Sequence, residues 1–148
     1  MDAIDKKLLN ALQEDFPCVT RPYLHIAEQL GLTEAEVLER VHNLKATGII
    51  RRMGAVFSGE ALGFVGRLCA MKVATNDIER VAAVINAYPN VTHNYLRSHE
   101  YNLWFTVSAE DEEELQRVLE NIQRTTGIAA LISLRSKQVF KLDARFAV

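Results

Sequence analysis

VTHNYLRSHEYNLWFTVSA, residues 91–109, contains two runs of strand-forming residues separated by a short polar turn. Side chains of a strand alternate between its two faces, so every second residue of each run shares a face. One face of the pair therefore collects polar and aromatic side chains: His93, Tyr95, Arg97, Asn102, Trp104 and Thr106. The opposite face of the second run carries Leu103, Phe105 and Val107, which suit a hydrophobic core.

The segments around this pair of strands define a complete module. LGFVGRLCAMKVA (62–74) is strand-like, and NDIERVAAVINAYPN (76–90) has the pattern of a helix that ends before a proline. AEDEEELQRVLENIQRTTG (109–127) predicts an amphipathic helix, and IAALISLRSKQVFKL (128–142) predicts one or two strands. The order β-α-β-β-α-β is that of a ferredoxin-like motif, which leaves one sheet face for a partner or a ligand.

The N-terminal residues show a different spacing of apolar side chains. IDKKLLNALQED (4–15), RPYLHIAEQLG (21–31) and TEAEVLERVHNLKATG (33–48) each place apolar residues at helical spacing. Thr33 followed by Glu36 fits a capping box, and the last two segments form a helix-turn-helix pattern. IIRRMGAVF (49–57) has strand-like character.

We therefore predict an α+β protein. An N-terminal winged helix-turn-helix domain would span residues 1–58. A ferredoxin-like βαββαβ module for ligand binding or catalysis would span residues 59–148.

Composition excludes several classes of protein. The chain has 148 residues, 49% of them hydrophobic, and a net charge of -2, so no polycationic surface attracts nucleic acid. No apolar run approaches the ~20 residues of a membrane span, and the charged N-terminus lacks a signal core. We expect a cytoplasmic protein with no membrane partner, in which Cys18 and Cys69 are reduced thiols. Phosphate-binding glycine loops, HExxH and GxSxG are all missing from the sequence.

The whole chain resembles the Lrp/AsnC transcription factors. The resemblance rests on IDKKLLNALQED, on IAEQLGLTEAEVLERVHNLKATGIIRR (26–52) and on the strand that follows the linker. The helix at 33–47, however, carries Glu34, Glu36 and Glu39, and acidic side chains would repel a phosphate backbone. We therefore expect no DNA partner and keep a small-molecule-sensing regulator as the alternative function.

RRMGAVFS (51–58) and HNYLRSHEYNLWFT (93–106) resemble a narrower group, the sirohaem decarboxylases. This resemblance implies a carboxy-lyase of haem biosynthesis. Such an enzyme removes CO2 non-oxidatively from two acetate side chains of sirohaem and produces didecarboxysirohaem. It also implies a homologous second subunit. No cofactor is required, because the iron tetrapyrrole substrate can itself take up the electron pair left by CO2.

Such a substrate needs cations for its carboxylates and flat walls for its ring. Arginine binds carboxylates in a bidentate way, so Arg51, Arg52 and Arg97 are the predicted carboxylate-binding residues. Tyr101 and Trp104 would lie against the macrocycle, with Asn102 as a further substrate contact. A plain core position for Trp104, and a wing or solvated hairpin for the two neighbouring arginines, are the alternatives.

Loss of CO2 leaves a carbon that must gain a proton, so the site needs a proton donor. Histidine titrates near neutrality, which makes His93 and His99 candidates, and Tyr95 is a further donor. Alternatively, His93 is a ligand of the substrate iron. The sequence does not separate these roles, and an ordinary hydrogen-bonded surface histidine is the remaining interpretation.

Overall fold

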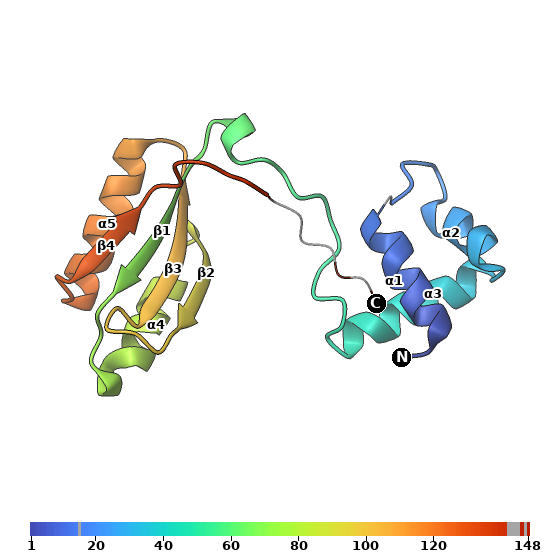
Figure 1. The fold of residues 1–148 in the computed structure, drawn as a ribbon, viewed down its shortest axis with the longest axis horizontal. Coiled ribbons are helices and arrows are strands. Elements are labelled where there is room, and N and C mark those ends of the chain that lie inside the picture. Colours follow the sequence, from blue (N-terminus) through green and yellow to red (C-terminus); the bar gives the residue numbers. More distant parts are fainter. Residues whose placement is uncertain (15, 142–145, 147) are drawn as a thin grey trace. The chain divides into compact units, whose positions relative to one another are not determined.

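The computed structural model describes residues 1–14, 16–141, 146 and 148. Contacts divide the chain into two compact units, one helical and one built on a sheet (Figure 1). The helical unit comprises Met1–Ala55 with the described residues from Lys141 onward, and the sheet unit comprises Val56–Phe140. The division thus follows Ala55, whereas the sequence predicts a boundary after residue 58.

Three helices form the helical unit: α1 (Ala3–Glu14), α2 (Pro22–Leu30) and α3 (Glu34–Ala46). The predicted capping box is confirmed, because the Thr33 hydroxyl accepts from the Glu36 N–H while the Glu36 carboxylate accepts from the Thr33 N–H. Gly31 ends α2 with φ 68°, a conformation that favours glycine. The tight turn between α2 and α3 confirms the helix-turn-helix.

The interior of the helical unit consists of one apolar side-chain cluster. Leu8 of α1, Ile26 of α2 and Val37 of α3 are almost fully buried in it. Val41 and Leu44 continue the buried stripe of α3, as its helical spacing predicts.

The strand character expected for residues 49–57 is wrong. All of these residues are described, and their backbone is bent and irregular, without a strand. Ile50 packs against the helical core, but Val56 and Phe57 are 82% and 75% exposed, so the end of this segment buries no apolar face. A strand also needs a neighbour for its backbone hydrogen bonds, and no described strand pairs with this segment.

The sheet unit has the predicted βαββαβ order. It contains β1 (Val65–Met71), α4 (Ile78–Asn86), β2 (Val91–Leu96), β3 (Leu103–Ala109), α5 (Glu112–Thr126) and β4 (Leu131–Leu134). Two short 3-10 turns, η1 (Glu60–Leu62) and η2 (Thr75–Asp77), precede β1 and α4. The strands form an antiparallel sheet in the order β2-β3-β1-β4. Residues 128–142 are expected to form one or two strands, and the described part of this segment contains one, β4. Leu142, the last residue of the segment, lies outside the described residues.

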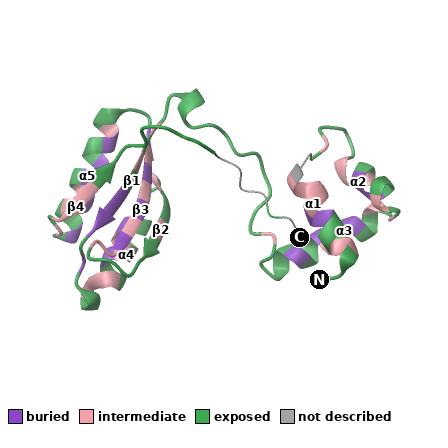
Figure 2. Cartoon of the chain, in the orientation of Figure 1, coloured by how far each residue is buried: buried purple, intermediate pink, exposed green. Residues whose placement is uncertain are grey.

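Both α4 and α5 pack on the same face of the sheet. Burial along β3 alternates strictly, with Leu103, Phe105 and Val107 in the core, as the alternation predicts (Figure 2). Val81 and Ile85 of α4 belong to the same core cluster. Within the described residues of this unit, no helix lies on the other face, which we call the open face.

Two further expectations concern the thiols and membranes. Cys18 and Cys69 are free, as predicted, and burial raises the pKa of the Cys69 thiol. No helix in the described residues is long and apolar enough to cross a bilayer.

Candidate functional site

The open face is where the predicted polar and aromatic side chains meet. Tyr95 of β2 pairs with Trp104 of β3, and His93 pairs with Thr106. Asn94 lies on the helix-covered side, where its amide donates to Asn86 of α4 at 2.9 Å. The alternation of β2 and β3 therefore places the imidazole, the phenol and the indole on one side of the sheet.

The rings of His93 and Tyr95 lie against each other. Their centroids are 6.1 Å apart and their planes differ by 25°, so the two rings are roughly parallel. Tyr95 is 50% exposed, so part of this residue is accessible to a molecule on the open face.

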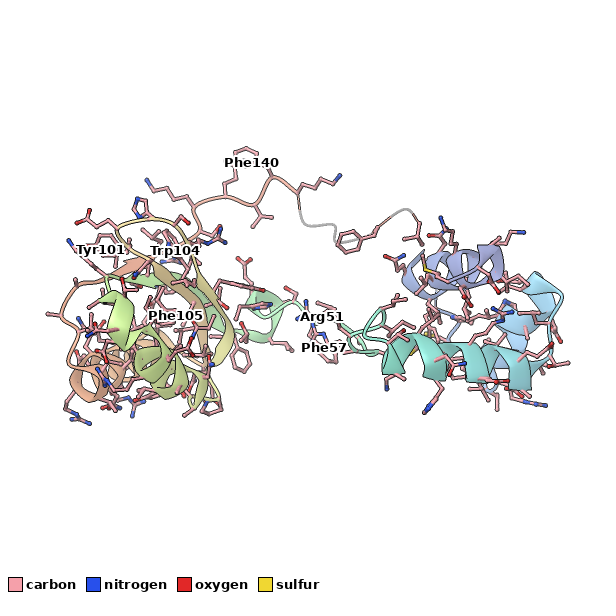
Figure 3. All side chains as sticks on the ribbon, turned by 90° about the horizontal axis from the view of Figure 1, so that it is seen from below. Arg51, Phe57, Tyr101, Trp104, Phe105 and Phe140 are labelled. Carbon is pink, nitrogen blue, oxygen red and sulfur yellow. The ribbon has the colours of Figure 1, made fainter. Side chains whose placement is uncertain are left out.

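Trp104 does not belong to the core cluster, so the alternative of plain core packing is wrong. Its indole Nε1 donates to the carbonyl of Tyr101 at 2.6 Å, which fixes the ring at the end of the β2–β3 turn. The guanidinium carbon of Arg97 lies 5.9 Å from the centre of this ring. Figure 3 shows Tyr101 and Trp104 on one side of the sheet and Phe105 on the side of the helices.

The turn between β2 and β3 is held by hydrogen bonds of its own side chains. His99 Nδ1 accepts from the Tyr101 N–H at 3.0 Å, and the two rings stack at 6.5 Å. The Asn102 amide donates to the Val73 carbonyl at 2.8 Å and accepts from the Val73 N–H at 3.0 Å. The polar atoms of Asn102 therefore attach the turn to the chain that follows β1.

A salt bridge borders the same turn. The ammonium of Lys72 donates to the carboxylate of Glu100, which raises the pKa of Lys72 and lowers the pKa of Glu100. Lys72 is thus paired with a carboxylate, whereas Arg97 contacts the ring of Trp104. Arg67 is on the helix-covered side and is paired with Glu112 of α5.

The remaining part of the open face is aliphatic. Ala70 is opposite Trp104 and Leu68 is opposite Thr106, and β4 continues the two rows with Ile132 and Leu134. Leu68 and Leu134 are both nearly half exposed. The face thus joins an aromatic and cationic half to a hydrocarbon half, a combination that suits a flat, apolar ring system with anionic substituents.

Two predicted carboxylate-binding residues belong to the other unit. Arg51 and Arg52 follow α3 and are exposed. Figure 3 labels Arg51 in this segment. The other predicted site residues, which include His93, Tyr95, Arg97 and Trp104, lie together in the sheet unit. The role of Arg51 and Arg52 in carboxylate binding stays a prediction.

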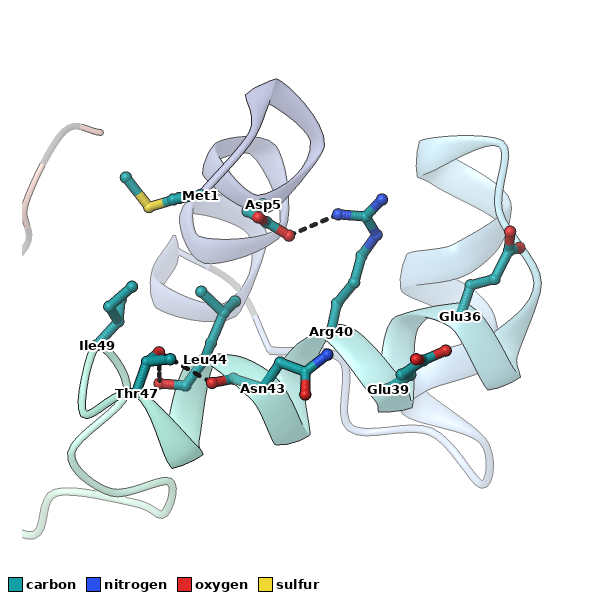
Figure 4. Close-up of a pocket in the computed structure, with 9 residues that line it drawn as sticks. All are labelled: Met1, Asp5, Glu36, Glu39, Arg40, Asn43, Leu44, Thr47 and Ile49. Atoms are coloured by element: carbon teal, nitrogen blue, oxygen red, sulfur yellow. Dashed lines mark hydrogen bonds and ion pairs between the residues drawn. The ribbon is translucent and has the colours of Figure 1, made fainter.

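The helical unit contains a separate cavity of about 460 Å³ (Figure 4). Arg40 lines it, and this guanidinium donates to Asp2 at 2.9 Å and to Asp5 at 2.7 Å. Glu36 and Glu39 lie on the same wall. The cavity is therefore acidic, and its arginine is already neutralised. No group of His, Cys, Asp and Glu side chains among the described residues could hold a metal ion.

Thr92 is the residue of this site that sequence reasoning missed. Strict alternation places it on the face opposite His93, but the register shifts between Val91 and His93. The Thr92 hydroxyl consequently lies 2.6 Å from the Thr106 hydroxyl and 3.0 Å from His93 Nδ1. Threonine is an ordinary strand residue, so nothing in the sequence signals this arrangement.

Two family models match the chain. Residues 5–51 match the siroheme decarboxylase NirDL-like helix-turn-helix domain, and residues 61–141 match the AsnC-like ligand-binding domain. The "siroheme decarboxylase alpha subunit" of Desulfovibrio desulfuricans is 46% identical over 99% of this chain and 84% of that protein. The "siroheme decarboxylase NirD subunit" of Pseudomonas aeruginosa is 40% identical over 99% of this chain and 96% of that protein.

Solved structures give the same two relationships. The crystal structure of the siroheme decarboxylase NirDL superposes with a TM-score of 0.72 at 33% identity and covers 93% of this chain. The chain spans only 45% of that protein. The same decarboxylase has also been solved with an iron-uroporphyrin III analogue. AsnC of E. coli superposes with a TM-score of 0.82 at 25% identity, over 98% of this chain and 97% of that one.

Proposed function

The chain belongs to the sirohaem decarboxylase family, and from this premise we propose that it removes CO2 from two acetate side chains of sirohaem. The observation that carries the proposal is the open face. It displays His93, Tyr95, Trp104 and an arginine next to exposed aliphatic residues. Such a surface offers a flat contact for the macrocycle and a guanidinium for a carboxylate of its rim.

Binding of the substrate would use the two halves of the open face differently. Leu68 and Leu134 would contact the ring through hydrocarbon, and Trp104 would stack on it or border it. Arg97 lies over the indole, and its N–H groups at the edge of the guanidinium would bind a carboxylate. Carboxylates that are bound away from the reacting position would orient the ring.

The reaction breaks the bond between the carboxylate carbon and the methylene carbon of an acetate group. CO2 leaves, and the electron pair remains on the methylene carbon, where the conjugated ring can take up its charge. A proton then completes a methyl group. No oxidant or reductant takes part in this balance.

The proton donor would be His93 or Tyr95, which stack on one another on the open face. His99 is held in the turn by the Tyr101 N–H, so we assign it a supporting role. His93 as a ligand of the substrate iron is the alternative use of the same imidazole.

A second, homologous module would complete the site. The curated relatives are named as subunits, and the NirDL protein has more than twice the length that this chain covers. The open face is exposed within the sheet unit, so a partner would be needed to exclude water from a bound substrate.

The regulator alternative requires a cationic recognition helix, and α3 does not provide one. Its central cation, Arg40, is paired with Asp2 and Asp5, and Glu36 and Glu39 lie beside it. This arrangement favours the enzyme over a DNA-binding protein.

An anaerobic assay tests the proposal. The purified chain, alone and with a homologous partner subunit, is mixed with sirohaem, and the product is identified by its mass and absorption spectrum. We expect a product that has lost two CO2 units. Tight binding without any change in mass would show that the chain is a sensor or a silent subunit.

A further inference from the structure

A bulge in β2 directs two consecutive side chains to the open face. Val91 pairs with Val107 and His93 pairs with Thr106, so two steps along β2 correspond to one step along β3. Thr92 is the extra residue, and both Thr92 and His93 are exposed. Bulges re-aim side chains and are frequent next to active sites.

Three polar groups converge at this bulge. Thr92 Oγ1 and Thr106 Oγ1 are 2.6 Å apart, and they lie 3.0 Å and 3.3 Å from His93 Nδ1. These distances allow a hydrogen-bonded triangle in which one ring nitrogen is contacted by two hydroxyls. No hydrogen bond of His93 Nε2 to another described residue accompanies it.

We propose that Thr92 and Thr106 are positioning residues that hold His93 through Nδ1, so that Nε2 is the nitrogen that acts on the substrate. This inference rests on the proposed function and deepens it. It applies equally to proton donation and to iron ligation, because both uses of the imidazole then proceed through Nε2. The hydroxyl pair prevents the ring from turning its other nitrogen toward the open face.

Hydroxyls suit this task because each can donate and accept a hydrogen bond. Nδ1 can accept from a hydroxyl when it is unprotonated and donate to one when it carries a proton. The pair thus holds the ring in the same orientation in either protonation state, without movement of heavy atoms.

A carboxylate, the common orienting partner of a functional histidine, would be unfavourable here. The substrate itself carries many carboxylates, and a further negative charge behind the imidazole would repel them. Among the described residues, none of the ion pairs involves His93. On the open face it contacts the Tyr95 ring and the two hydroxyls.

Steady-state kinetics of the assembled enzyme provide the first test. Thr106→Val removes the hydroxyl but keeps the shape of the side chain and its preference for a strand. We expect kcat to fall about tenfold while KM changes less than about twofold, since a misdirected imidazole slows the chemistry more than it weakens binding. Thr106→Ser keeps the hydroxyl and should retain most of the rate. Ser108→Ala, on the same face of β3 but outside the triangle, is the matched control and should resemble the wild type.

Nitrogen NMR of the substrate-free, 15N-labelled chain provides the second test and does not depend on activity. The ring signals of His93 are assigned by their loss in His93→Gln. In a Thr92→Val/Thr106→Val double variant, we expect the Nδ1 signal of His93 to shift while those of His25, His42 and His99 stay in place. A merely structural role of the two threonines would leave the Nδ1 signal unchanged.

The outcomes separate the two claims. Unchanged kcat in Thr106→Val, or an unmoved Nδ1 signal in the double variant, would overturn the positioning role even if the enzyme decarboxylates sirohaem. A wild-type enzyme that releases no CO2 would overturn the proposed function, and the NMR comparison alone would then decide whether the hydroxyl pair holds His93.

Discussion

The guanidinium of Arg97 lies over the indole of Trp104, with 5.9 Å between its central carbon and the ring centre. Arg97 directly follows β2, and Trp104 is in β3. The indole is in turn held by the Tyr101 carbonyl. A cation held in this way by an aromatic face keeps its N–H groups available for an anion, which is the property that a carboxylate-binding arginine needs.

Arg97→Ala should weaken substrate binding. A charge-assisted hydrogen bond contributes about 1.5–3 kcal/mol, so KM for sirohaem should rise about tenfold or more while kcat changes less. Arg117→Ala, an exposed arginine of α5 on the covered side of the sheet, is the matched control. Equal KM values for the wild type and Arg97→Ala would remove this residue from the site.

His93→Ala should slow turnover at least tenfold, which corresponds to about 1.4 kcal/mol of barrier. The side chain is exposed, so the fold should survive, and circular dichroism should match that of the wild type. His42→Ala, at an exposed position of α3, serves as the control and should leave the rate unchanged. Full activity of His93→Ala would contradict both the proton-donor and the iron-ligand role.

Asn102→Ala should loosen the β2–β3 turn. Val73 is buried, and the substitution leaves its N–H and carbonyl without their side-chain partner. The free energy of unfolding of the sheet unit should fall by about 1–3 kcal/mol, as measured from its unfolding transition in urea. Asn76→Ala, at an exposed position of η2, should cost much less. Similar midpoints for both variants would show that the Asn102–Val73 bonds do not stabilise the turn.

The helical unit should lose stability in acid through Asp2 and Asp5. Mutual hydrogen bonds to backbone N–H groups, and then the hydrogen bonds from Arg40, lower the pKa of both carboxyls below 3.8. A carboxyl group whose pKa is lowered in the folded protein stabilises it fully when the pH is above the pKa of the unfolded state. This stability is lost as the pH falls through the pKa of the folded state. The melting temperature of the wild type should therefore fall more steeply below about pH 4 than that of Asp2→Asn/Asp5→Asn. Parallel pH curves for the two proteins would contradict these contacts.

Local sequence patterns accounted for most of the fold. The spacing of apolar residues predicted all five α-helices of the described chain, and the Thr33–Glu36 pair located the start of α3. The same reasoning was wrong for residues 49–57, because apolar character does not supply the neighbouring strand that a β-segment needs. Alternation in β3 was predicted correctly, since one face of this strand is buried along its whole length.

The candidate site was predictable only in part. The period of two placed Tyr95 and Trp104 on one face, because this rule depends on local backbone geometry alone. Asn102 was predicted as a substrate contact, and in the structure its amide is hydrogen-bonded to the backbone of Val73, which lies 29 residues earlier in the sequence. This use of Asn102 depends on which strands become neighbours.

The amino-acid sequence alone determined the two modules, the face that the core takes and the polar and aromatic face opposite to it, because helix and strand periods are properties of consecutive residues. The position of Arg97 over Trp104, and the bulge that brings Thr92 to the Nδ1 atom of His93, follow from the folded structure and not from any local pattern. Both relationships depend on the register between β2 and β3, and register results from the long-range pairing and packing of whole strands.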